Sequence, residues 1–286
     1  ATVIQAIQNA WIIITGDGVT TPTEYTRAEV EAMTCTPVRL YSTINTWPTK
    51  KMYWAEGVKL ADLLTAAGIK PEAKLITFKS SDGFTKHMTR DQLDTTRYYY
   101  PGLKENHEYF GQILGSPENP EEVDIILALK SIEGSENLDY IGSKEAPHLI
   151  MGQRWLTEQT NEIFVKYVKT ITVSTETPAK WETPAADVAS GTVPAGTQVA
   201  LSTSNMDGDS IHYTTDGTNP TIQSPMYNWI KKRWWGSRSD DLATINHKIA
   251  VDRTMTLKAK SIGPGQTDSD IATYEYRVTD AYPPTL

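Results

Sequence analysis

Threonine is distributed unevenly along the chain, and this constrains the fold more than any other feature of the sequence. Of 38 threonines, 17 lie up to Thr96, none lies between Arg97 and Leu156, and 21 lie in the last 130 residues. Because the branched Cβ of threonine suits a pleated, half-exposed strand, both threonine-rich regions predict β-structure. We expect the middle region to contain helix and loop instead.

Local patterns in the first half predict strands separated by short helices. Thr26, with Glu29 three residues later, forms a capping box that predicts a helix at 27–33. Apolar residues at 58–67 fall on one helical stripe before Gly68, which suits a helix end. A third helical turn is expected at 90–95. We predict strands at 11–15, 38–44, 75–79, 149–151 and 163–173, and a long loop at 98–122.

Two Thr-Pro pairs among small residues at 174–186 are typical of a linker. We therefore place the domain boundary near Ser174, which divides the chain into domains at 1–174 and 175–286. Beyond the boundary, short alternating runs are separated by turn signals, which indicates a small β-sandwich. These runs lie at 198–203, 210–214, 255–261 and 271–278.

Charge and cysteine content exclude several classes of protein. The 27 Lys and Arg against 35 Asp and Glu give a net charge of −8, which excludes a general nucleic-acid binder. The longest apolar run, 10–14, is far shorter than the roughly 20 residues of a transmembrane helix. A single cysteine excludes a disulfide framework and a CxxC zinc site, and the histidines show no metal-ligand spacing. The chain begins at Ala1 without signal-peptide features, so we expect any export signal to have been removed or never included.

Four segments of the first half form an ordered set: Gly57–Leu64, Ser81–Gly83, Ala146–Ile150 and Val165–Ile171. In their order and context they resemble the molybdopterin-binding oxidoreductase domain, the sulfite oxidase fold, over residues 11–173. The resemblance implies an α+β domain whose cleft holds a molybdenum–pterin cofactor through a cysteine thiolate.

Two positions of this cleft depart from the family. Thr43 stands at the position that aligns with the cysteine ligand, and His148 stands where the family often carries an arginine. A threonine hydroxyl is a hard, neutral donor and does not replace a soft thiolate. We therefore expect no bound cofactor and a domain that has lost catalysis, because a fold alone does not carry a function.

Several polar residues remain as conditional cleft candidates. If a phosphate-bearing ligand binds there, Lys166 and Arg97 are its natural partners. The candidates are Thr43, Asn45, Asp82, Arg97, His148 and Lys166. We interpret Cys35, eight residues before Thr43, as a buried structural thiol.

The second half resembles the C-terminal β-sandwich of chitobiase and related β-hexosaminidases, a module often appended to extracellular enzymes and surface proteins. The resemblance rests on Tyr213–Thr221, which reads Tyr-Thr-Thr-Asp-Gly-Thr-Asn-Pro-Thr. In this turn Asp216 can bond to its own backbone, Gly217 supplies a positive φ, and Pro220 stiffens the exit. The motif specifies a fold and carries no chemistry.

An insertion at 225–242 interrupts this β-sandwich. Pro225 and Gly236 bracket a predicted helix at 226–235. On that helix Trp229, Arg233 and Trp235 face outward as a candidate patch for sugar rings, a partner or an anionic polymer. Cation–π packing between the two domains is the alternative role for these side chains.

The sequence as a whole predicts an α+β sulfite-oxidase-like domain followed by an immunoglobulin-like β-sandwich. We expect a non-catalytic recognition protein outside the cell or in the cell envelope. Its partners would be other domains of a larger surface protein and a glycan or cell-wall polymer. Two alternatives stay open: a molybdopterin-dependent oxidoreductase with an atypical metal shell, and a carbohydrate-binding surface module.

Overall fold

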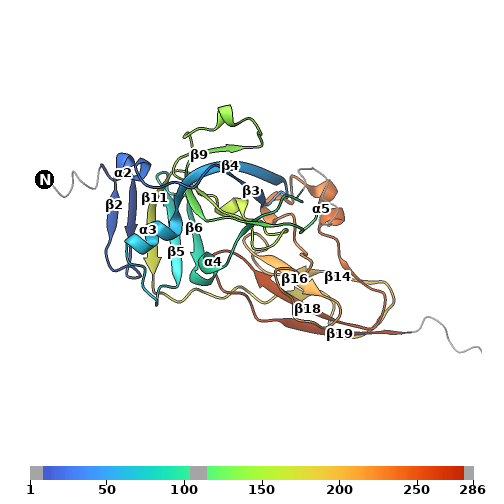
Figure 1. Cartoon of the computed structure of the whole chain (residues 1–286). Helices are drawn as coiled ribbons and strands as arrows, with labels where there is room; N and C mark the ends of the chain where they lie inside the picture. The colour runs from blue at the N-terminus through green and yellow to red at the C-terminus, as the bar shows by residue number, and fades with distance from the viewer. Residues whose placement is uncertain (1–8, 104–114, 280–286) are drawn as a thin grey trace, which may run out of the picture. The chain divides into compact units, whose positions relative to one another are not determined.

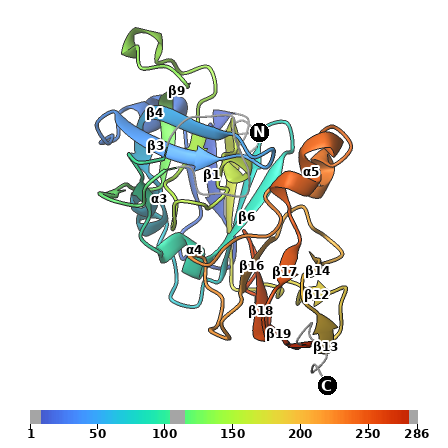
Figure 2. The same ribbon diagram turned by 90° about the vertical axis from the view of Figure 1, so that its right-hand side faces the viewer.

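The computed structural model describes residues 9–103 and 115–279, which are mostly β-strand with few helices (Figures 1 and 2). These residues form two compact units. Unit 1 comprises 9–45, 49–103 and 115–178, and unit 2 comprises 46–48 and 179–279. No helix in these described ranges has the length and apolar character needed to cross a membrane.

The first sheet of unit 1 has five strands in the order β2-β1-β11-β5-β6. β1 runs parallel to β11, and the other neighbours are antiparallel. The strands are β1 (Ile12–Thr15), β2 (Thr23–Tyr25), β5 (Leu75–Ser80), β6 (Thr85–Thr89) and β11 (Val168–Ser174). The strand expected at 163–173 begins only at Val168, because the 3-10 turn η2 (Asn161–Ile163) and an irregular stretch precede it.

The second sheet of unit 1 is antiparallel, in the order β10-β9-β4-β3. Its strands are β3 (Arg39–Ile44), β4 (Lys50–Lys59), β9 (Ile126–Glu133) and β10 (His148–Ile150). β9 corrects the expectation that the threonine-free middle region lacks strands. Residues 126–128 are buried between β4 and β10, where an aliphatic run replaces the threonines of half-exposed strands.

Short segments complete the middle region. β7 (Tyr98–Tyr99) pairs with β8 (Glu121–Glu122), and η1 (Leu138–Tyr140) is a 3-10 turn. The expected loop at 98–122 therefore contains strand pairing at both ends, while its residues 104–114 lie outside the described part.

Three short helices of unit 1 are α2, α3 and α4, and capping boxes define the starts of α2 and α4. α2 (Arg27–Glu31) has the predicted capping box, in which the Thr26 hydroxyl accepts a hydrogen bond from the Glu29 amide. α3 (Leu60–Ala66) starts later than predicted because residues 58–59 belong to β4. Gly68 has φ +68° after this helix. α4 (Arg90–Asp94) has a second capping box, which the sequence reading missed.

The core of unit 1 is one cluster of buried side chains that joins both sheets and α3. Ile14 and Phe78 contribute from the first sheet, Tyr41 and Leu127 from the second, and Leu64 from α3. Alternate residues of β1, β5 and β11 are buried, so one face of the first sheet is apolar.

Unit 2 is a β-sandwich. Its main sheet has the order β13-β19-β18-β16, with β14 paired to β17 and β12 paired to β15. Val199, Ile249, Leu257 and Tyr276 from these sheets meet in one core. The elements are β12 (Ala185–Ala186), β13 (Gly191–Pro194), β14 (Thr197–Val199), β15 (Leu201–Ser202), β16 (Ser210–Thr214), β17 (Ile249–Val251), β18 (Met255–Ile262), β19 (Ala272–Thr279) and α5 (Ser239–Ile245).

Sequence patterns located the main strands of unit 2 to within one residue. The run at 198–203 is divided between β14 and β15, and β13 and β17 were not predicted. The turn after β16 has the predicted chemistry: the Asp216 carboxylate accepts the Thr218 amide at 3.0 Å, and Gly217 has φ +80°.

The predicted helix at 226–235 is wrong. Within this range only η3 (Lys232–Trp234) is helical, and it is a 3-10 turn. The Tyr227 amide donates to the carbonyl of Ile211, and the Asn228 side chain accepts the Ile211 amide at 2.8 Å. Residues at the start of the insertion therefore pair with β16 instead of closing helical turns.

We predict that Asn228→Ala destabilises unit 2 by about 2–3 kcal/mol. Asn228 is fully buried and also donates to the Asp209 carbonyl at 2.9 Å, so its loss leaves the Ile211 amide without this partner and removes one of the two donors to that carbonyl, the other being the Lys231 ammonium at 2.7 Å. Urea unfolding followed by circular dichroism measures the change. The exposed Gln223→Ala is the control, with an expected change within about 0.5 kcal/mol.

Candidate functional site

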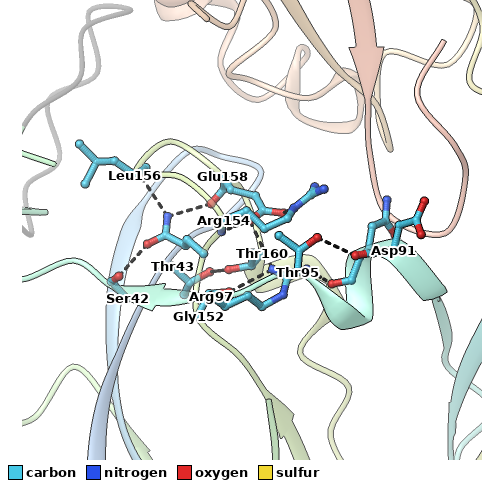
Figure 3. Close-up of polar contacts among 12 residues, drawn as sticks. Ser42, Thr43, Asp91, Thr95, Arg97, Gly152, Arg154, Leu156, Glu158 and Thr160 are labelled. Carbon is cyan, nitrogen blue, oxygen red and sulfur yellow. Dashed lines mark hydrogen bonds and ion pairs between the residues drawn. The ribbon is translucent and has the colours of Figure 1, made fainter. Parts of the chain in front are cut away.

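Thr43 of β3 is buried and committed to a hydrogen bond inside unit 1. Its hydroxyl lies 2.6 Å from the hydroxyl of Thr160 (Figure 3). The adjacent Ser42 hydroxyl donates to the Gln153 side chain at 2.6 Å and accepts the Tyr100 amide at 3.0 Å. The segment that contains Gln153 and Thr160 thus covers β3 at the position predicted to face a cofactor.

Arg97 belongs to a buried ion cluster with Glu158 and Arg154 (Figure 3). Its guanidinium donates to the carbonyls of Gly152 and Gln92, both at 3.1 Å, and lies 3.3 Å from the Glu158 carboxylate. Burial lowers the pKa of Arg97 to about 10, so it is charged at neutral pH.

Both oxygens of the Glu158 carboxylate accept hydrogen bonds from Arg154. The Arg154 side chain donates to one at 2.8 Å, and the Arg154 amide donates to the other at 2.6 Å. Burial acts to raise the pKa of Glu158, but the guanidinium groups of Arg154 and Arg97 outweigh it and hold the pKa below its usual value. Arg97 and Arg154 therefore share one carboxylate, and Arg97 is already engaged within the protein.

His148 of β10 is buried and neutral. Burial lowers the pKa of His148 to about 4, and its Nδ1 lies 3.3 Å from the Ser131 hydroxyl and 3.4 Å from the Glu145 carboxylate. The ring packs edge-on against Tyr53. Lys166 forms an ion pair with the same Glu145. The structure thus brings His148 and Lys166 together through one carboxylate.

The side chains of Asp82 and Asn45 stabilise turns by accepting hydrogen bonds. Asp82 accepts hydrogen bonds from the Ser80 hydroxyl and from the Phe84 amide at 3.1 Å in the turn between β5 and β6, which lowers its pKa. Asn45 accepts the Thr49 amide at 2.5 Å at the turn between β3 and β4. These hydrogen bonds hold the two turns and involve neither Arg97 nor His148.

These side chains do not fit a molybdenum–pterin cofactor. Thr43 supplies a neutral hydroxyl already paired with another hydroxyl, and His148 supplies no positive charge at neutral pH. Cys35 is half-buried, burial raises its pKa, and its neighbour Thr36 bonds to Gly57 of β4. Because Thr43 pairs with Lys51 and Thr36 bonds to Gly57, Cys35 lies at least six residues (from 51 to 57), roughly 20 Å, further along β4. In the described ranges no three metal-ligating side chains cluster.

The three side chains expected to form a patch on unit 2 do not form an exposed surface. Trp229 is buried, with 6% of its surface exposed, contrary to its predicted outward position. Arg233 pairs with Asp207 at 2.8 Å. Trp235 is half-buried, and its indole N–H donates to the Ile230 carbonyl at 2.9 Å. The cause is the missing helix, because residues 227 and 228 bond to Ile211 of β16 and the helical positions assumed for Trp229 do not exist.

The sequence reading missed an aromatic groove of about 510 Å³ on unit 1. In β4 and β3, Tyr53 and Tyr41 point into the core, so Trp54, Met52 and Leu40 lie on the other face of the sheet. The signal was present in the sequence, because β4 carries large apolar residues on both faces. The groove is lined by Leu40, Met52, Trp54, Tyr99, Gly134, Ser135 and Glu136.

Comparisons with known proteins give a family match for unit 2. Residues 188–273 match the sequence profile of the Chitobiase/beta-hexosaminidase C-terminal domain family. No curated protein matches the chain. Among solved structures, the chain is similar to the sulfane dehydrogenase SoxCD from Paracoccus pantotrophus, with 13% identity, a TM-score of 0.35, and coverage of 93% of this chain and 75% of that chain. The sulfite oxidase fold of the first half stays a prediction.

We predict that Glu158→Gln lowers the free energy of unfolding by about 3 kcal/mol at pH 7, because it leaves the buried Arg97 charge uncompensated. The pKa of folded Glu158 lies below its ordinary value of 4.5, so its contribution is present above pH 4.5 and is lost as the pH falls through the folded pKa. The difference between wild type and variant should shrink there. Denaturant unfolding at several pH values measures it, with the exposed Glu72→Gln as control.

We predict a second pH dependence from His148. Its pKa is about 4 when folded and 6.5 when unfolded, so only the unfolded chain binds this proton between those values. Stability should therefore fall by up to about 1.4 kcal/mol for each pH unit from 6.5 down to 4. His148→Gln should remove this slope, whereas the exposed His247→Gln should retain it. Equal slopes in wild type and His148→Gln would contradict the buried, neutral state.

Proposed function

We propose that unit 1 binds an uncharged oligosaccharide in the groove beside Trp54 and Tyr99. On this proposal the chain is a non-catalytic recognition part of a larger protein outside the cell or in the cell envelope. The observation that carries the proposal is the aromatic lining of a groove on the face of β3 and β4 that points away from the core.

The lining matches the two chemical faces of a sugar ring. A pyranose presents axial C–H groups on one face, which stack on an aromatic ring, while its hydroxyls remain available for hydrogen bonds at its rim. Trp54 and Tyr99 are half-buried and provide rigid surfaces for such stacking. The volume of about 510 Å³ lies within the range of small-molecule sites.

The polar end of the groove favours neutral ligands. Glu136 is exposed, and within the described ranges its carboxylate has no ion-pair partner, so it can accept hydrogen bonds from hydroxyl or amide groups. The same carboxylate, in a chain of net charge −8, repels anionic sugars. Glycoside hydrolysis ordinarily uses a pair of carboxylates, and the lining contains one. Binding without cleavage follows.

The family match of unit 2 supports a role of the chain in carbohydrate recognition. The family that residues 188–273 resemble is named for chitobiase and β-hexosaminidase, enzymes whose names denote action on chitobiose and hexosaminides. We therefore choose oligomers of N-acetylglucosamine as the first probe. The molybdopterin oxidoreductase alternative is not proposed, because Thr43, His148 and Arg97 lack the donors and open charge it requires.

We predict that Trp54→Ala weakens the binding of a four-sugar N-acetylglucosamine oligomer by at least about tenfold, because it removes the stacking surface. Isothermal titration calorimetry on the whole chain measures the affinity. Trp54→Phe, which keeps an aromatic face, should retain most of it.

Phe84→Ala is the matched control, because Phe84 is an exposed aromatic residue at the turn between β5 and β6 and does not line the groove. Its affinity should equal that of wild type. The proposal fails if wild type binds no sugar on a glycan array, or if folded Trp54→Ala binds as tightly as wild type.

A further inference from the structure

Unit 2 contains an open groove of about 500 Å³ with two arginines in its lining. Arg253 and Thr254 precede β18, and Arg277 lies on β19. Thr215 and Asp216, which follow β16, form another side of the groove. The groove does not include the three insertion residues whose surface was predicted from the sequence.

The register of the main sheet brings these side chains together. Met255 pairs with Tyr276, and both belong to the core, so their neighbours Thr256, Glu275 and Arg277 lie on the opposite face of the sheet. A parallel bridge between Asp216 and Thr256 places the turn after β16 beside the same face. Three separate segments thus build the groove on a rigid sheet.

The two arginines of the groove differ from all other arginines in the described ranges in their hydrogen bonding. Arg253 and Arg277 are exposed, and in these ranges neither guanidinium has a hydrogen bond or ion pair. Every other arginine there bonds to a carboxylate or carbonyl oxygen of the protein. The lining holds two guanidinium and two carboxylate groups and so has no net charge, but the guanidinium groups offer N–H donors that the groove carboxylates do not occupy and that an anion can accept.

The carboxylates of the groove restrict which anion fits. Asp216 is occupied by the Thr218 amide and hydroxyl, at 3.0 and 2.6 Å, within its turn. Glu275 is exposed and directly opposite Thr256. A bare polyanion would be repelled by Glu275, whereas a singly charged group on a hydroxyl-rich ring can pair with the arginines and donate its hydroxyls to Glu275.

We propose that this groove binds an acidic saccharide, a sugar ring that carries one oxyanion, with Arg253 and Arg277 as its anion partners. Uronate and sulfated sugars share this chemistry, and the experiment distinguishes them. The site is separate from the oligosaccharide groove of unit 1 and does not depend on the function proposed for it.

The test is titration of the whole chain with a methyl galacturonoside, which carries one carboxylate, and, in parallel, with a disaccharide that carries one sulfate. We expect Arg253→Gln and Arg277→Gln each to weaken binding by about tenfold and the double variant to abolish it. Rising salt should weaken wild-type binding, because both guanidinium groups are exposed. Preference for either probe supports the site and identifies the oxyanion as carboxylate or sulfate.

Two controls separate this site from general charge and from unit 1. Lys248→Gln removes an exposed positive charge of unit 2 outside the groove and should leave the affinity unchanged. Trp54→Ala should also leave it unchanged, so failure of the neutral-sugar proposal is distinguishable from failure here. The proposal is overturned if wild type binds neither acidic probe, or if the folded double variant binds as tightly as wild type.

Discussion

The buried ion cluster of Arg97, Glu158 and Arg154 is the constraint on which the interior of unit 1 depends. An ionised carboxylate in this position is tolerable only because two guanidinium groups and a backbone amide surround it. Arg97 in turn requires the carbonyls of Gly152 and Gln92. Two segments distant in sequence, 92–97 and 152–158, are therefore fixed to each other by these ion pairs and hydrogen bonds.

This cluster explains why residues of the expected type in the predicted cleft are not available to bind a cofactor. Arg97 was expected to be an anion partner of a bound ligand, but in the structure it pairs with Glu158, 61 residues away in the chain. Nothing local to Arg97 predicts that pairing. Thr43 and Thr160 are separated by 117 residues and present the same difficulty. Side-chain identity limits what a site can bind, whereas long-range packing decides whether the side chain is available.

The difference between local and long-range contacts also separates the parts of the fold that were predicted correctly from those that were not. The α2 capping box and the turn at Asp216 are closed by residues two or three positions apart, and both were predicted correctly. The helix predicted for the insertion after Pro225 was wrong. The pattern of Trp and Lys there is compatible with a helix, but Tyr227 and Asn228 form hydrogen bonds with β16 instead. Strand β9 was missed because burial on both sides removes the alternation that marks a strand.

The two grooves differ in the force that each offers a ligand. Trp54 and Tyr99 act through apolar contact, which salt hardly affects, whereas Arg253 and Arg277 act through exposed charges, which are screened beyond about 8 Å at physiological ionic strength. A polymer with neutral and acidic sugars would contain ligands for both. Because one chain carries both grooves, occupation of one raises the effective concentration of that polymer at the other, provided its length spans them. If both proposed sites bind one polymer, weak individual sites suffice for firm attachment, and salt would weaken that attachment through the unit 2 site.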